Sequence, residues 1–195
     1  MHTMKIVTID CALKEVLKKK TLDIQNHEWN LALEIAENLK KTLLPLMPAA
    51  GLAAPQIGVS KSIFIYSYDR QLVNLEVVIN PTYKPLGEEI WKGWEGCFSV
   101  ILSEKTWKLA KVPRYKTILV QYLNLEGKSV EKILEGFAAK VFQHEYDHLQ
   151  GIENIDRPDA EILSFESKEE LSAFMQAIRQ EDADFYKAPQ DKNNP

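Results

Sequence analysis

The clearest hydrophobic pattern in the chain is a run of apolar residues at helical spacing near the N-terminus. Within HEWNLALEIAENLKKTLL, apolar residues recur at intervals of four: Leu31, Ile35, Leu39 and Leu43. This spacing places them on one face of a helix of about four turns. Asn26 stands just before the segment and is a residue type that favours helix N-termini. We therefore predict an amphipathic helix capped by Asn26.

The middle of the chain changes from loop signals to β-rich runs. The stretch PLMPAAGLAAPQIG contains three prolines and two glycines, which favours a loop that neither a helix nor a strand runs through. Four later runs are rich in β-branched and aromatic residues and predict strands: KSIFIYSY, LEVVIN, KTILVQYLN and KSVEKIL. The last two flank a turn from Asn124 to Gly127, so we predict that they form a hairpin.

A second helical pattern begins at Glu135. Four residues follow at steps of four, three and four and therefore share one face: Phe137, Val141, His144 and His148. Gly151 comes directly after this pattern and supplies a helix stop. The sequence predicts a helix that carries two histidines on one side.

A third helix is predicted near the C-terminus. Ser167 and Glu170 form a capping box, and an apolar stripe follows it: Leu171, Phe174, Met175 and Ile178. No repeat, flexible linker or break in composition divides the chain. We predict one α+β domain over residues 1–187 and a disordered polar tail over residues 188–195.

Composition excludes several classes of protein. Hydrophobic residues make up 45% and charged residues 27%, and 24 Lys and Arg against 28 Asp and Glu leave a net charge of -4. A duplex nucleic-acid binder needs a basic excess, so we expect no nucleic-acid specificity. Two cysteines, Cys11 and Cys97, cannot form a disulfide framework, and the apolar runs are too short to span a membrane. We expect a cytoplasmic protein without a membrane partner.

The strongest local chemical signal is HEYDH, which fits the pattern HExxH. His144 and His148 lie one helical turn apart and can bind one metal ion, with Glu145 at its edge. A catalytic metal site normally has three protein ligands and one open position. The two histidines therefore need a third partner from elsewhere in the chain.

The residues themselves leave the third ligand open. Cys97 lies in WEGCFSV, where Gly96 allows close backbone approach and a thiolate can serve as a soft anionic ligand. Glu166 or Glu169 could instead complete the site, as in a zinc endopeptidase. A thiol that is only a small buried side chain remains the alternative for Cys97.

Three motifs in order favour Cys97. The segments GLAAPQ (51–56), EGCFS (95–99) and QHEYDHLQG (143–151) have the order and approximate spacing typical of peptide deformylases, which the chain resembles over roughly residues 5–165. The resemblance implies antiparallel β-sheets packed around a central HExxH helix, with an N-terminal and a C-terminal helix. It also implies a metal-dependent hydrolase that removes the N-formyl group from N-formylmethionyl nascent polypeptides and releases formate.

The resemblance also implies roles for single residues. Three match the metal ligands of the family: Cys97, His144 and His148. Glu145 matches its general acid/base, and Gln56 with the backbone N–H of Phe98 matches its oxyanion donors. Substrate-binding positions are Ala50, Gly51 and Phe98, and Glu95 and Gln143 match supporting positions.

The expected cofactor is one Fe²⁺ ion, for which Zn, Ni or Co can substitute in this family. The expected partners are formylmethionyl peptides on nascent chains, with transient docking on the ribosome, and the expected oligomeric state is a monomer. From Ser167 to Lys187 there are three basic and five acidic side chains, which argues against binding ribosomal RNA by charge alone.

The chain departs from the family pattern at a few positions. Ala49 replaces the first glycine of GxGLAAxQ, and Phe98 replaces the usual leucine of EGCLS. Lys105 and Lys108 are candidates for a basic residue that holds the peptide. A deformylase-like protein that binds peptides without catalysis is the remaining alternative.

Overall fold

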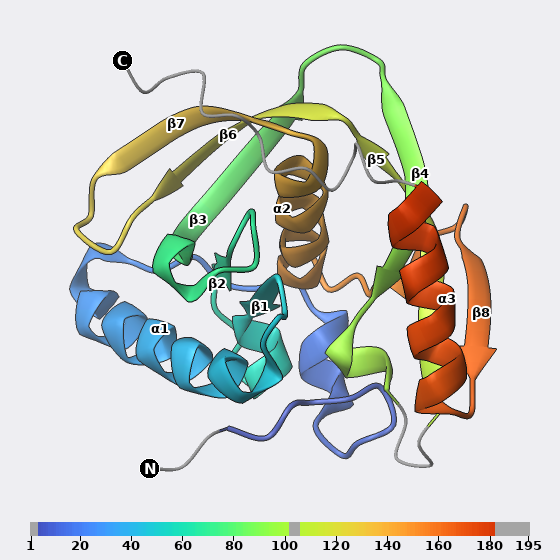
Figure 1. The fold of residues 1–195 in the computed structure, drawn as a ribbon. Helices are drawn as coiled ribbons and strands as arrows, with labels where there is room; N and C mark the ends of the chain where they lie inside the picture. The colour runs from blue at the N-terminus through green and yellow to red at the C-terminus, as the bar shows by residue number, and fades with distance from the viewer. Residues whose placement is uncertain (1–3, 102–105, 182–195) are drawn as a thin grey trace.

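The computed structural model describes residues 4–101 and 106–181, and within them two antiparallel sheets surround one helix (Figure 1). The larger sheet has the order β1-β2-β3-β6-β7: β1 (Gly51–Ala53), β2 (Ile63–Tyr66), β3 (Glu76–Pro85), β6 (Thr117–Leu123) and β7 (Ser129–Glu135). The smaller has the order β4-β5-β8: β4 (Ile90–Gly96), β5 (Trp107–Tyr115) and β8 (Glu161–Phe165). The described residues also form three α-helices: α1 (Trp29–Leu43), α2 (Gly136–Leu149) and α3 (Lys168–Glu181).

Helix α2 is the centre of the fold and lies between the two sheets (Figure 1). Phe142 on α2 meets Phe64 and Tyr66 of β2 edge-on, with ring centroids 5.1 and 5.8 Å apart. Such edge-to-face contacts add to the stabilisation from burial alone. The expected fold, with antiparallel sheets around the HExxH helix, is therefore confirmed.

Helix α1 covers the opposite face of the larger sheet. Ile35 and Leu39 pack there against Ile63 and Ile65, the alternate residues of β2. Because β2 is buried on both faces, its apolar residues form a continuous run instead of alternating with polar ones. This explains the unbroken apolar stretch IFIY within the run KSIFIYSY.

The predicted cap of α1 is wrong. A single 3₁₀ turn (Asn26–Glu28) precedes the helix, so Asn26 lies inside this turn. The turn is closed by the Glu28 carboxylate, which accepts a hydrogen bond from the Gln25 N–H at 2.9 Å. Glu28 is the N-cap residue of α1, but its side chain closes the preceding turn and makes no capping hydrogen bond to the helix.

Helix α3 covers the smaller sheet. The Phe174 ring lies 5.4 Å from Trp94 and 5.2 Å from Phe165. As predicted, the Ser167 hydroxyl accepts a hydrogen bond from the Glu170 N–H, at 3.2 Å. The predicted tail, residues 188–195, lies outside the described residues. None of the described helices has the length and apolar character that crossing a membrane requires.

Four strands were not predicted from the sequence: β1, β4, β5 and β8. The proline-rich stretch expected to be loop contains the three-residue strand β1, which pairs with β2. Strands β5 and β8 carry no clear alternating pattern, and β5 pairs with β8 on one side and β4 on the other. In contrast, the predicted hairpin between β6 and β7 forms, with Asn124 Oδ1 accepting hydrogen bonds from two N–H groups of the turn.

Helix α2 ends at Leu149, two residues before Gly151, which is the predicted helix stop. This glycine has a left-handed φ of 76°, and a Cβ there would lie 2.7 Å from the backbone of Lys18 and Lys19. The glycine therefore serves both the turn and a close contact between two distant segments.

Replacement of Gly151 by alanine should reduce stability by more than the backbone conformation alone explains. Gly87→Ala is the matched control, because Gly87 also has a left-handed φ, of 92°, but nothing lies within 4 Å of its Cβ position. We expect Gly87→Ala to cost about 1 kcal/mol of unfolding free energy, and Gly151→Ala at least about 2 kcal/mol, in urea titrations. Equal losses would show that the contact with Lys18 and Lys19 is easily relieved.

Candidate active site

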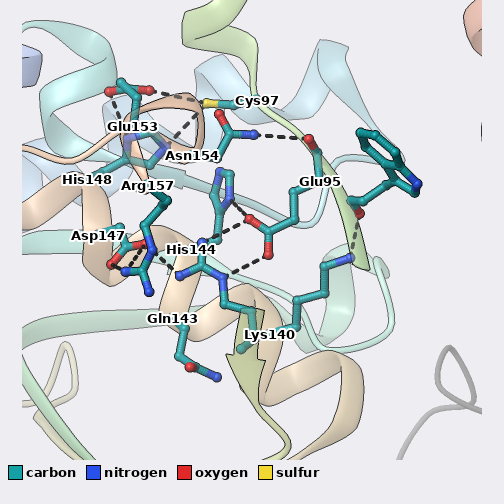
Figure 2. Close-up of polar contacts among 12 residues, drawn as sticks. Glu95, Cys97, Lys140, Gln143, His144, Asp147, His148, Glu153, Asn154 and Arg157 are labelled. Carbon is teal, nitrogen blue, oxygen red and sulfur yellow. Dashed lines mark hydrogen bonds and ion pairs between the residues drawn. The ribbon is translucent and has the colours of Figure 1, made fainter. Parts of the chain in front are cut away.

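The two histidines of α2 lie close to a cysteine that directly follows a strand of the smaller sheet (Figure 2). Cys97 follows β4 directly, and its Sγ lies 3.4 Å from Nε2 of His148. One possible ligand atom from each of Cys97, His144 and His148 lies within 4.8 Å of the others. Among the described residues, these three form the cluster that could hold a metal ion.

A carboxylate lies behind each imidazole. Glu95 Oε2 is 2.9 Å from Nδ1 of His144, and Glu153 Oε1 is 3.2 Å from Nδ1 of His148 (Figure 2). In each case the Nδ1–H can donate to the carboxylate, which leaves Nε2 for a metal. Such partners orient imidazole ligands and increase their basicity.

A buried arginine forms an ion pair with one of these carboxylates. Arg114 on β5 donates from Nε and Nη2 to the two oxygens of Glu95, both at 2.9 Å, and from Nη1 to Asp147 at 2.6 Å. Burial alone would raise the pKa of Glu95, but Arg114 holds it well below its usual range. Arg157 also donates to Asp147, at 3.2 Å (Figure 2). A chain of charges thus joins β4, β5 and α2.

Glu145 is buried at the edge of the cluster and 4% exposed. Its Oε2 has no hydrogen-bond partner among the described residues, and burial raises the pKa of this carboxyl group. A Cβ at Gly51 would lie 2.4 Å from Glu145 Oε1. Strand β1 can therefore approach the carboxylate this closely only because residue 51 is a glycine. Glu145 is therefore held in place while keeping an oxygen available for chemistry.

The other predicted site residues surround a pocket of about 260 Å³ beside the cluster. Those that line it include Ala50, Gly51, Gln56 and Phe98. Gln56 accepts a hydrogen bond from the Ala53 N–H at 2.9 Å, and its NH₂ group lies 3.5 Å from Cys97 Sγ and 3.2 Å from Ser99 Oγ. The Ala53 contact thus fixes the amide with its donor end toward the cluster.

Gln143 lies next to the cluster but contacts a strand. Its side chain pairs with both backbone groups of Tyr115, accepting from the N–H at 3.0 Å and donating to the carbonyl at 2.9 Å. Gln143 therefore fastens α2 to the end of β5. Its support for the site is indirect.

The residues of the endopeptidase alternative lie elsewhere. Glu166 and Glu169 are exposed around the start of α3, and neither belongs to the cluster. Of the two candidate basic residues, Lys108 lines the pocket and Lys105 lies outside the described residues. The described structure does not favour the endopeptidase.

Sequence reasoning missed Glu153, Arg114 and Asn154. Glu153 is fully buried two residues after the helix stop, and its Oε2 lies 3.7 Å from Cys97 Sγ. Asn154 donates from Nδ2 to the Glu95 carbonyl at 3.0 Å. No local signal marked Arg114, because it stands among other basic residues such as Lys111 and Lys116. Asp147 is buried and accepts hydrogen bonds from Arg114 and Arg157.

The donor set suits a transition metal. One thiolate and two imidazoles are ligands for zinc, iron and similar ions. Burial raises the pKa of Cys97, but His148 and His144 together lower it below the ordinary value through charge and hydrogen bonding. A metal binds the thiolate form of cysteine. The arrangement is that of a metal-dependent hydrolase.

Comparison with known proteins identifies the family of hydrolases that this chain resembles. A family model described as polypeptide deformylase matches residues 4–162. The peptide deformylase of Fusobacterium nucleatum subsp. nucleatum is 43% identical over 146 residues, which make up 74% of this chain and 77% of that protein. The crystal structure of peptide deformylase from Thermotoga maritima matches with a TM-score of 0.68 and 34% identity, covering 80% of this chain and 98% of that one.

A further solved structure is the class I type b peptide deformylase from Acinetobacter baumannii bound to Met-ala-ser. It matches with a TM-score of 0.69 and 29% identity, covering 80% of this chain and 100% of that one. The chain belongs to the peptide deformylase family. It is an enzyme that removes the N-formyl group from nascent chains.

Loss of Arg114 should strongly destabilise the protein. Arg114→Met leaves two buried carboxylates without their shared cation, which typically costs about 3–5 kcal/mol. Lys92→Met is the control, because it breaks an ion pair with Glu161 whose side chains are 43% and 57% exposed. We expect that control to cost about 1 kcal/mol or less in urea unfolding. Similar losses in both variants would contradict a structural role for the buried network.

Proposed function

We propose that Cys97, His144 and His148 hold one divalent ion, Fe²⁺, with Zn, Ni or Co as substitutes. Two observations support this ligand set: the short distances within the cluster and the carboxylates behind both imidazoles. A bound ion supplies a Lewis acid that lowers the pKa of a water molecule and polarises a carbonyl oxygen. The choice of iron rests on membership of the family, because the three ligands alone suit several metals.

Glu145 is the general base and acid of the proposed reaction. Its unpaired Oε2 takes a proton from the attacking water as the water oxygen bonds to the formyl carbon. The carboxyl group then gives the proton to the amine nitrogen as the C–N bond breaks. The products are formate and a peptide with a free methionine amino group. A carboxyl group whose pKa is raised by burial is suited to accept and release a proton near neutral pH.

Gln56 and the backbone N–H of Phe98 donate hydrogen bonds to the oxyanion of the tetrahedral intermediate. Gln56 has its NH₂ group directed toward the cluster because its carbonyl oxygen is fixed by Ala53. Phe98 follows Cys97 directly and lines the same pocket. Loss of one such donor typically costs about 10²–10³ in rate.

The peptide lies along the backbone of Ala50 and Gly51, at the start of strand β1. Both residues line the pocket, and Gly51 brings the strand against Glu145. The Ala49–Ala54 segment is a close wall that admits a formyl group and excludes larger acyl groups. A related enzyme was solved bound to Met-ala-ser, and the proposed product here is a peptide of the same kind.

We also propose that the enzyme works as a cytoplasmic monomer in transient contact with the ribosome. Nascent chains present their formylated N-termini there, so contact with the ribosome raises the local substrate concentration. Because the segment around α3 has more acidic than basic side chains, this contact involves protein or shape recognition more than charge pairing with RNA.

Substitution of Glu145 tests the proposed chemistry. Glu145→Gln keeps the size of the side chain but removes the proton acceptor, so kcat for formate release from a formyl-methionyl peptide should fall by about 10²–10⁴. Metal content, measured by elemental analysis, should stay at the wild-type level. Full activity in the variant would refute the role of Glu145.

Substitution of Cys97 tests the ligand set. Cys97→Ala should lose its metal during anaerobic dialysis, whereas Cys11→Ala should keep it, because Cys11 lies outside the cluster. Metal content after dialysis and the cobalt absorption spectrum provide the measurements. Retention of the ion by the Cys97 variant would reject the proposed coordination.

A further inference from the structure

The pocket beside the metal cluster continues to the C-terminal helix. Its lining includes Leu171 and Met175 of α3 as well as His144 and Glu145 of α2, so one cavity connects the two helices. A peptide whose formyl group lies at the cluster can therefore extend to α3 without leaving the pocket.

Phe174 determines which face of α3 meets the smaller sheet. Its ring packs against Trp94 of β4 and Phe165 of β8, at 5.4 and 5.2 Å between ring centroids. Leu171 and Met175 lie one helical turn apart beside this contact, and both are only partly buried. The packing of α3 thus leaves two apolar side chains at the surface of the pocket.

The smaller sheet continues this apolar surface toward the cluster. Trp107 and Leu109 of β5 line the same pocket and, being two residues apart, point to the same face of the sheet. Leu109 lies opposite Gly96 in the strand pairing, and a Cβ at Gly96 would lie 3.3 Å from Leu109 Cδ2. Because Gly96 directly precedes Cys97, the apolar surface begins next to the metal cluster.

The methionine side chain of the substrate has a different place in the pocket. The formyl group is bonded to the methionine nitrogen, so this side chain must lie directly beside the cluster. Val141 lines the pocket one helical turn before His144, on the same face of α2. The α2 side of the pocket is therefore suited to methionine.

Strand β4 has one side facing α2 and the other facing α3. Glu95 points toward α2, where it bonds His144, whereas Trp94 points toward α3, where it meets Phe174. Successive side chains of an extended peptide likewise point to opposite sides. A peptide with its methionine against Val141 therefore directs its next side chain toward α3.

We infer that the enzyme prefers formylated peptides with an apolar residue directly after methionine, and that Leu171 and Met175 contact that side chain. The inference rests on the deformylase function proposed above and adds a substrate class to it. Trp107 and Leu109 complete the apolar surface that receives the side chain. Because the gain comes from removing apolar surface from water on binding, it should be expressed in KM more than in kcat.

Three peptides test the preference: formyl-Met-Leu-Ser, formyl-Met-Asn-Ser and formyl-Met-Ser-Leu. Leucine and asparagine have similar size and shape, so the first two peptides differ mainly in polarity, and the third moves leucine by one position. For the wild-type metalloenzyme we expect kcat/KM to be about five- to tenfold higher for the first peptide than for either of the others. Because no charge is recognised, moderate salt should leave this ratio unchanged.

Variants assign the preference to α3. Leu171→Ala and Met175→Ala, combined in one protein, should reduce the ratio between the first two peptides to about twofold or less, chiefly by raising KM for the leucine peptide. Leu33→Ala is the matched control, because Leu33 is a leucine of α1 that is 43% exposed and does not line the pocket. That control should keep the wild-type ratio.

The possible outcomes separate the preference from the proposed function. Equal kcat/KM for all three peptides would overturn the preference and leave the deformylase function intact, and a preference for leucine at the later position would overturn the assigned position. No formate release from any peptide would overturn the proposed function itself. An unchanged ratio in the double variant would reject α3 as the recognising element. The wild-type comparison needs no variant, so it is decisive even if the double variant folds poorly.

Discussion

The buried ion pair between Glu95 and Arg114 is the interaction on which the site depends. Two hydrogen bonds of 2.9 Å join the side chains, and Arg114 extends the connection to Asp147 on α2. Glu95 also bonds His144 and lies two residues before Cys97. Burying such charges is costly unless each is paired, so the pairing favours the arrangement of sheet and helix described here. That register brings the thiol to the imidazoles.

Local patterns were enough to predict the elements that carry the chemistry. The helical spacing around His144 and His148, the stop at Gly151 and the hairpin at Asn124 depend on neighbouring residues in the chain, and all three were predicted. The Asn26 cap was wrong because Asn26 lies in a 3₁₀ turn that the Glu28 side chain closes, and the helix begins only at Trp29. Strand β1 was missed because three paired residues within a proline-rich stretch leave no periodic signal.

The supports of the site depend on long-range contacts, which a single sequence does not display. Arg114 gains its role from Glu95 and Asp147, which are 19 and 33 residues away in the chain and are brought close only by folding. Glu153 is five residues from His148, but folding alone brings it to Cys97. Cys97 was distinguished from the competing carboxylates by resemblance to a family, because the residues alone left the third ligand open. The folded structure adds what the motifs lack, namely the burial and the hydrogen bonds that would tune each group.

Helix α3 has a consequence for inhibitor design. Leu171 and Met175 of this helix form part of the pocket wall, although the family match ends at residue 162. A compound that extends from the metal cluster onto these two side chains would touch a part of the chain outside that match. Such a compound offers a route to selectivity that the shared catalytic motifs do not provide.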